Sequence, residues 1–211
     1  MNWPWPSLRT LVIAAGIAIV LLAAGSGGWY WYAGQQRRVA AAYAEVMARA
    51  YAANAPQAPA DAKARAQQDI ERLLAQHPSA TPVAEAAFEL GNLRYAARQW
   101  APARGAYEIA AGRAQSSTVR ALARTSIGYT WEAERDWGKA IDTYQGIARD
   151  LGPKDFLFDE VSFALARAQE LGGKPADAIA TYQRLLKDEP AGLRSEEAKQ
   201  QLMRLGAKAD K

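Results

Sequence analysis

The chain has 211 residues, half of them hydrophobic, with 26 Lys or Arg against 22 Asp or Glu and a formal net charge of +4. This length suits one ordinary domain with an appendage, and the interspersed charges lack the concentrated basic face of nucleic-acid binders. The absence of cysteine excludes disulfides, thiolate metal sites and cysteine nucleophiles. The single histidine, His77, precedes a proline, which favours a loop or helix-end role over catalysis or metal binding. We therefore expect no nucleic-acid partner, no cofactor and no metal.

An apolar segment with aromatic flanks opens the chain. Residues 8–28 contain one charge, and as a helix at about 1.5 Å per residue they span roughly 31 Å, which matches a hydrocarbon core of about 30 Å. Trp3 and Trp5 precede the segment, and the sequence WYWY follows it at residues 29–32. Indole and phenol rings favour the membrane–water interface. The pattern predicts a transmembrane anchor, with Ser7 as its N-cap.

The competing interpretation is a cleaved signal peptide, for which the small residues AAGSGG at 23–28 offer a cleavage site. The apolar run is longer than a signal needs, and the aromatic residues beyond it would then have no purpose, so the anchor is favoured. The positive-inside rule weakly favours a cytoplasmic domain, but the count of charges does not decide the orientation. Arg9 precedes the span, whereas Arg37, Arg38 and Arg49 follow it, but a long domain translocates largely regardless of such charges.

The remainder of the chain repeats itself with a period near 37 residues. Three copies start at Ala84, Ala121 and Asp159, and an earlier, worn copy ends in ARAQQDIERLLAQHP. Helical spacing within each copy predicts an antiparallel pair of helices, and the pairs are expected to stack because none buries its apolar face alone. Three positions define the register, and they hold Ala66, Ala103, Ala140 and Ala178, then Ile70, Tyr107, Tyr144 and Tyr182, then Leu73, Ala110, Ile147 and Leu185.

Small residues are expected to bring the two helices of each pair together. They are Gly91, Gly128 and Ala166, and the tyrosine of each copy is expected to fill the gap toward the next pair. The pattern resembles the tetratricopeptide repeat, most closely in AEAAFELGNLRYAARQWAPARGAYEIA. The usual unit of that family has 34 residues, and the extra residues here fall between the helix pairs.

The sequence thus predicts an all-α protein, with an N-terminal transmembrane helix followed by an α-solenoid of tetratricopeptide-like helix pairs. Residues 1–34 form the anchor, and residues 35–60 form a juxtamembrane helix and loop that can continue the anchor helix. Residues 61–190 hold about three or four helix pairs. Residues 191–211 form a C-terminal cap helix and a tail, as such stacks need at an open end.

No catalytic pattern is present. The chain has no GxGxxG, P-loop, HExxH or GxSxG motif, and we expect it not to be an enzyme. The acidic runs at Asp159 and Ser195 stand where helices begin, and acids there favour the helix dipole. Trp100 and Trp137 precede the second helix of their pairs and are expected to lock the turn by packing.

A partner-binding groove is implied by the tetratricopeptide resemblance, because the first helix of each pair faces the concave side in that family. The mixture of aromatic and polar residues there suits an extended peptide or a partner helix. The alternative is that some of these side chains only pack against the next pair. The groove lacks the Lys/Arg clamp that family members use for a partner's C-terminal carboxylate. Mapped by register, the groove residues are Glu85, Phe88, Asn92, Tyr95, Thr125, Tyr129, Glu132, Phe163, Arg167 and Glu170.

The order of parts resembles a second, narrower family. The aromatic exit of the span, GWYWYAGQQRRVAAAYAEV, followed by such repeats is similar to the YfgM-type ancillary subunit of the bacterial SecYEG translocon. That resemblance implies an inner-membrane scaffold whose domain faces the periplasm and associates with the translocon and a membrane-anchored periplasmic chaperone. The alternative is a soluble periplasmic repeat protein in envelope assembly, released by signal cleavage.

Overall fold

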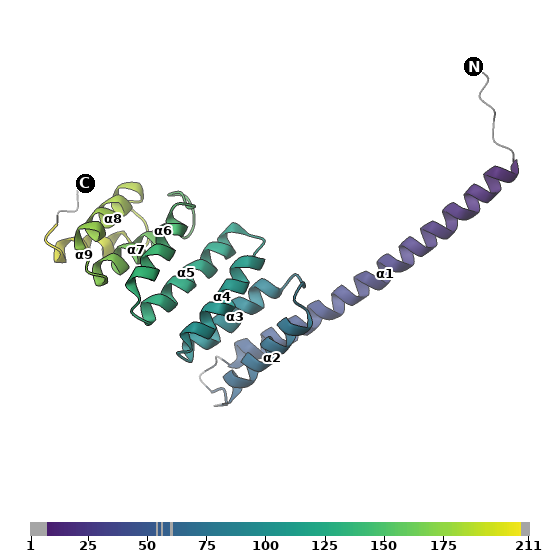
Figure 1. Cartoon of the computed structure of the whole chain (residues 1–211), viewed down its shortest axis with the longest axis horizontal. Coiled ribbons are helices and arrows are strands. Elements are labelled where there is room, and N and C mark those ends of the chain that lie inside the picture. The colour runs from purple at the N-terminus through teal and green to yellow at the C-terminus, as the bar shows by residue number, and fades with distance from the viewer. Residues whose placement is uncertain (1–7, 54, 56, 60, 208–211) are drawn as a thin grey trace, which may run out of the picture.

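The computed structural model describes residues 8–53, 55, 57–59 and 61–207, and within them the protein is helical without any strand (Figure 1). The predicted all-α class is confirmed, and the molecule is a helical solenoid with a long helix at its N-terminal end. The tryptophans Trp3 and Trp5, the predicted cap at Ser7 and the last four residues of the tail lie outside the described residues.

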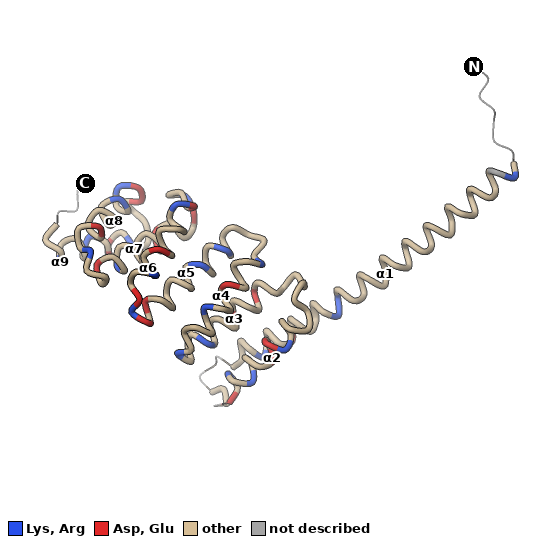
Figure 2. Tube along the Cα trace, viewed as in Figure 1, with Lys and Arg blue, Asp and Glu red and all other residues tan. Residues whose placement is uncertain are grey.

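Helix α1 spans Leu8–Ala53 without interruption and is about 69 Å long. Its apolar part is not buried by the rest of the molecule, and it extends away from the repeats in Figure 1. By length and composition it is the one helix in the described part of the chain that could cross a membrane, although a signal sequence passes the same test. Figure 2 shows that it carries no charge between Arg9 and Arg37.

The C-terminal part of α1 is also the first helix of the solenoid. Tyr43, Val46 and Ala50 are buried against α2, which spans Ala62–Gln76. The Tyr43 hydroxyl donates a hydrogen bond of 3.1 Å to the carbonyl oxygen of His77. His77 is the C-cap of α2, which confirms the predicted helix-end role of the single histidine.

Three further helix pairs and a final helix follow. Each helix packs against its neighbours in the chain, and α1 also touches α3, as expected of a solenoid. Charges of both signs are spread along the stack (Figure 2). The pairs are α3 (Val83–Ala96) with α4 (Trp100–Arg113), α5 (Ser117–Ala133) with α6 (Trp137–Ala148), and α7 (Phe158–Leu171) with α8 (Pro175–Asp188), before α9 (Ser195–Arg204).

The turns inside the last three pairs share one backbone geometry. Arg98, Arg135 and Gly173 occupy the same register position, and all have positive φ values of 59°, 60° and 74°. Trp100 packs edge-on against Tyr95 of its own pair, with ring centroids 4.9 Å apart. Close packing of the Trp100 ring beside the turn agrees with the expected locking role of this tryptophan.

Glycine and tyrosine fit together inside the helix pairs. A Cβ atom added to Gly91 would overlap the Tyr107 ring, and one added to Gly128 would overlap the Tyr144 ring. Each tyrosine therefore fills the space over the glycine of its own pair. The ring of Tyr144 also reaches the next pair, as expected, because it belongs to a buried cluster with Val161 and Ala164 of α7.

Candidate partner-binding groove

The first helices of successive pairs, α3, α5 and α7, carry all the residues that the register assigns to the groove (Figure 1). These residues differ in accessibility. Glu85 on α3 is exposed, whereas Thr125 and Phe163 are buried with 1% and 4% of their surface exposed. The others are half-buried: Phe88, Asn92, Tyr95, Tyr129, Glu132, Arg167 and Glu170.

Thr125 and Phe163 are corrections to the predicted groove, because neither presents a surface to a partner. The Thr125 hydroxyl donates to the Ala121 carbonyl oxygen at 2.8 Å, within its own helix. The Phe163 ring packs against Tyr182 with centroids 5.5 Å apart. Phe88 holds the same register position and packs in the same way against Tyr107, at 5.5 Å. This position therefore faces the second helix of its pair.

Glu132 joins three helices at the centre of the groove. Its carboxylate accepts a hydrogen bond of 2.7 Å from the Tyr144 hydroxyl of α6. It also accepts bonds from Nη2 and Nε of Arg167 on α7, at 2.9 and 3.1 Å. Burial opposes the charge of Arg167, but the bonds and the attraction of Glu132 outweigh this and raise the pKa of the guanidinium. Such bidentate pairs are among the stronger ion pairs in proteins.

A second cluster links α5, α7 and α9. The Tyr129 hydroxyl donates to the Glu160 carboxylate, and Arg194 Nε donates to the same carboxylate at 2.7 Å. Burial and, next, the hydrogen bond to Glu160 raise the pKa of Tyr129, so its hydroxyl stays protonated. Sequence reasoning missed Glu160 and Arg194. A signal was present, because Glu160 stands at the register position of Glu85, which the prediction includes.

Ion pairs occupy the charged groove residues of α5 and α7, so the α3 part of the groove is the more accessible part. Glu170 is held by an ion pair to Arg204 of α9, so Glu132, Arg167 and Glu170 are all engaged within the stack. Glu85 on α3, by contrast, is exposed. Beside it, Asn92 accepts a hydrogen bond of 3.0 Å from the Tyr107 hydroxyl. Glu85, Asn92 and Tyr95 therefore form the part of the candidate groove that no ion pair between described residues holds.

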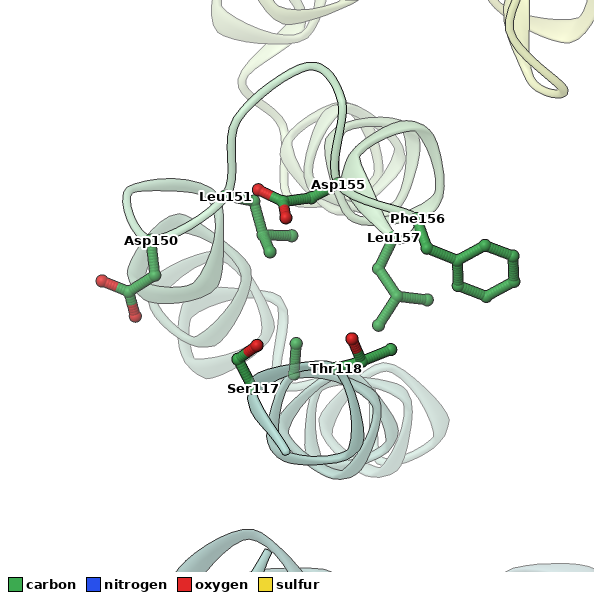
Figure 3. A pocket seen from close by; sticks show the side chains of 8 residues that line it. Ser117, Thr118, Asp150, Leu151, Asp155, Phe156 and Leu157 are labelled. Carbon is green, nitrogen blue, oxygen red and sulfur yellow. The ribbon is translucent and has the colours of Figure 1, made fainter. Parts of the chain in front are cut away.

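Some hollows outside the groove lie at the loops between pairs. One of about 100 Å³ is bounded by the start of α5 and by the loop between α6 and α7 (Figure 3). Leu151 and Leu157 point into it, whereas the Phe156 ring points away. Its carboxylates are engaged, since Asp150 pairs with Arg124 at 2.7 Å and Asp155 accepts from the Gly152 amide at 2.6 Å. Nothing in this arrangement supplies a nucleophile with a base.

In the described part of the chain, no group of three or more His, Asp or Glu side chains is placed to hold a metal ion. Among the groove residues, Glu132 pairs with Arg167, Glu170 pairs with Arg204, and Tyr129 donates to Glu160.

Comparison with known proteins supports the repeat assignment for the last complete pair. A sequence profile of the tetratricopeptide repeat matches residues 160–192, which cover most of α7, all of α8 and the start of the loop before α9. No curated protein matches the chain. The molecule is therefore a helical solenoid that contains a tetratricopeptide repeat, formed by the pair α7 and α8.

Proposed function

We propose that this chain is a membrane-anchored scaffold that binds other proteins at the bacterial inner membrane, with its solenoid in the periplasm. The observation that carries the proposal is the continuity of α1 from Leu8 to Ala53. One end of this helix is apolar and exposed, and the other end is part of the solenoid core. One continuous helix thereby joins the solenoid to a segment suited to lipid.

The exposed apolar and aromatic side chains of α1 support an anchor that stays in lipid over a cleaved signal. Large apolar residues such as Leu22 and Val20 are mostly exposed along α1, and burial of each such side chain is worth about 1.5–3 kcal/mol. Cleavage at residues 23–28 would leave Trp29 and Tyr30, which are 74% and 79% exposed, on the surface of a soluble protein. Lipid accommodates both the apolar side chains and the interfacial rings.

Partner binding is proposed to occur on the α3 part of the groove. A tetratricopeptide repeat supports a role in protein–protein interaction, and the exposed Glu85 with the half-buried Tyr95 offers a charge and a ring to a peptide or helix. We further propose that binding occurs without catalysis, since the carboxylates of Glu132 and Glu170 and the hydroxyl of Tyr129 are engaged in holding helices together. The resemblance to the YfgM-type family supports translocon or chaperone components as partners in the handling of exported proteins.

Fractionation tests the anchor. We expect the tagged full-length chain to sediment with inner membranes and to resist alkaline carbonate extraction. External protease should digest the solenoid in intact spheroplasts, and protection would place the domain in the cytoplasm instead. Recovery of a shortened, freely soluble chain would favour the alternative, a periplasmic repeat protein released by signal cleavage.

A charge reversal tests the groove. Glu85→Lys changes an exposed groove residue without removing any ion pair described above, and Glu108→Lys is its matched control on α4, where Glu108 is also exposed. After crosslinking and solubilisation of membranes, we expect Glu85→Lys and Tyr95→Ala to lower the recovery of the same partner by severalfold. Equal recovery from Glu85→Lys, Tyr95→Ala and Glu108→Lys would sink the groove assignment.

A further inference from the structure

A ring of four residues surrounds Gly34 where α1 leaves the apolar segment. Tyr30 and Trp31 lie four and three residues before this glycine, and Arg37 and Arg38 lie three and four residues after it. Residues at these spacings are neighbours on a helix surface. Apart from the neighbouring backbone of its own helix, no atom lies within 4 Å of the place where a Gly34 Cβ would stand. The glycine therefore leaves a notch in the helix surface between these four positions.

The notch belongs to a hollow of about 200 Å³, which we call the Gly34 hollow. It is lined by Tyr30, Trp31, Gly34, Gln35 and Arg38. Cα–Cβ bonds of a helix tilt toward its N-terminus, so the arginine side chains point back toward the rings and the apolar segment. Arg38 and Trp31 line this hollow together although they are seven residues apart.

Both arginines are available to an outside anion. Arg37 and Arg38 are exposed, and no ion pair between described residues involves either of them. The first carboxylate along α1 is that of Glu45, seven residues after Arg38. Figure 2 shows basic colouring on α1 between the uncharged span and the solenoid. Two adjacent, unpaired guanidinium groups favour a phosphate oxyanion.

We infer that the Gly34 hollow binds the headgroup of an anionic phospholipid, with the phosphodiester at Arg37 and Arg38 and the glycerol region against Tyr30 and Trp31. This inference rests on the proposed anchor, which places the rings at the interface. A zwitterionic headgroup fits less well, because its own cation is repelled by the two arginines. An anionic lipid supplies the phosphate without that cation.

The test measures lipid retention on the purified full-length chain in detergent by native mass spectrometry, with equimolar phosphatidylglycerol and phosphatidylcholine. We expect the wild type to retain phosphatidylglycerol preferentially. Arg37→Gln combined with Arg38→Gln should lower that preference roughly thirtyfold at low salt. Gly34→Leu keeps both charges and favours helix, yet should lower the preference severalfold by filling the notch. The matched control, Lys63→Gln with Arg65→Gln on α2, should change nothing.

Each contrary result has a distinct meaning. A Gly34→Leu variant with undiminished preference would show diffuse charge attraction and overturn the hollow. Displacement of the lipid by millimolar inorganic phosphate would overturn the choice of a lipid ligand. Equal retention of both lipids by a chain that stays in micelles would overturn this inference and leave the anchor standing. A chain that leaves the micelles would contradict both.

Discussion

Glycines at different places in the same stack are under opposite constraints. A Cβ on Gly128 would overlap the Tyr144 ring, whereas a Cβ on Gly105 would meet nothing within 4 Å. We expect Gly128→Ala to lower the free energy of unfolding by about 1–3 kcal/mol, because the ring has to move. Gly105→Ala should raise it by about 0.5–1 kcal/mol through helix propensity. Urea midpoints measured by circular dichroism would decide this, and a harmless Gly128→Ala would mean that the pair does not pack so closely.

Two tyrosines at one register position differ in their hydroxyl groups. The Tyr144 hydroxyl donates to the Glu132 carboxylate at 2.7 Å, whereas the buried Tyr182 hydroxyl has no partner among the described residues. Tyr144→Phe should therefore lower the free energy of unfolding by about 2 kcal/mol, the size of a hydrogen bond to a charged group. Tyr182→Phe should be neutral or stabilising, since it removes an unsatisfied group. Equal losses from both variants in urea titrations would contradict this assignment of partners.

At the level of elements, α1 has two halves with different roles. None of the described side chains before Gln35 is buried, whereas Tyr43, Val46 and Ala50 are part of the core of the first pair. We expect a chain that starts at Gln35 to fold as a stable, soluble solenoid. A chain that starts at Ala55 loses that packing and leaves Ile70 uncovered. Loss of several such buried side chains costs several kcal/mol, so it should melt earlier and aggregate.

Thermal melts and size-exclusion chromatography would compare the two truncations. A chain that starts at Asp61 and includes α2 onward serves as a further control, because it also lacks the partner of α2. If the chain that begins at Gln35 were the unstable one, the soluble solenoid would depend on the apolar half of α1. Equal stability of all truncations would show that α1 is no part of the first pair.

The repeat period predicted most of the helices, because the apolar residues of each copy recur in the sequence with helical spacing. The helix pairs and the final helix were readable in this way. The groove was less predictable. Phe88, Thr125 and Phe163 share one register position, and the sequence does not give the rotation of the first helix about its axis. That rotation turns this position toward the second helix of the pair.

The ion pairs also lay beyond sequence reasoning, for a different reason. Glu132 and Arg167 are 35 residues apart and come from different pairs, so only the stacking of α5 on α7 brings them together. The same holds for Glu160 and Arg194 across α7 and the start of α9. A repeat period places these residues on corresponding faces. It does not tell whether they meet a partner protein or each other.

Across the whole molecule, the buried tyrosines link stability to alkaline pH. Burial is the main cause that raises the pKa of Tyr107, Tyr129 and Tyr144 above the ordinary value of 10, and it raises that of Tyr182 to about 12. In the unfolded chain these phenols ionise near pH 10, while in the folded chain they keep their protons. The stabilisation is therefore complete below about pH 10 and is lost as the pH rises further.

We therefore predict a fall in the free energy of unfolding between about pH 10 and 11.5, and a nearly flat profile from pH 8 to 9.5. Each fully buried tyrosine contributes at most about 1.4 kcal/mol per pH unit to the fall, because the unfolded state then binds fewer protons than the native state. Urea titrations across this range measure it on the chain that starts at Gln35. The Tyr107→Phe variant, which removes one such phenol from the core, should show a shallower decline. An unchanged slope in that variant would mean that lysine deprotonation, and not the stacked tyrosines, governs alkaline unfolding.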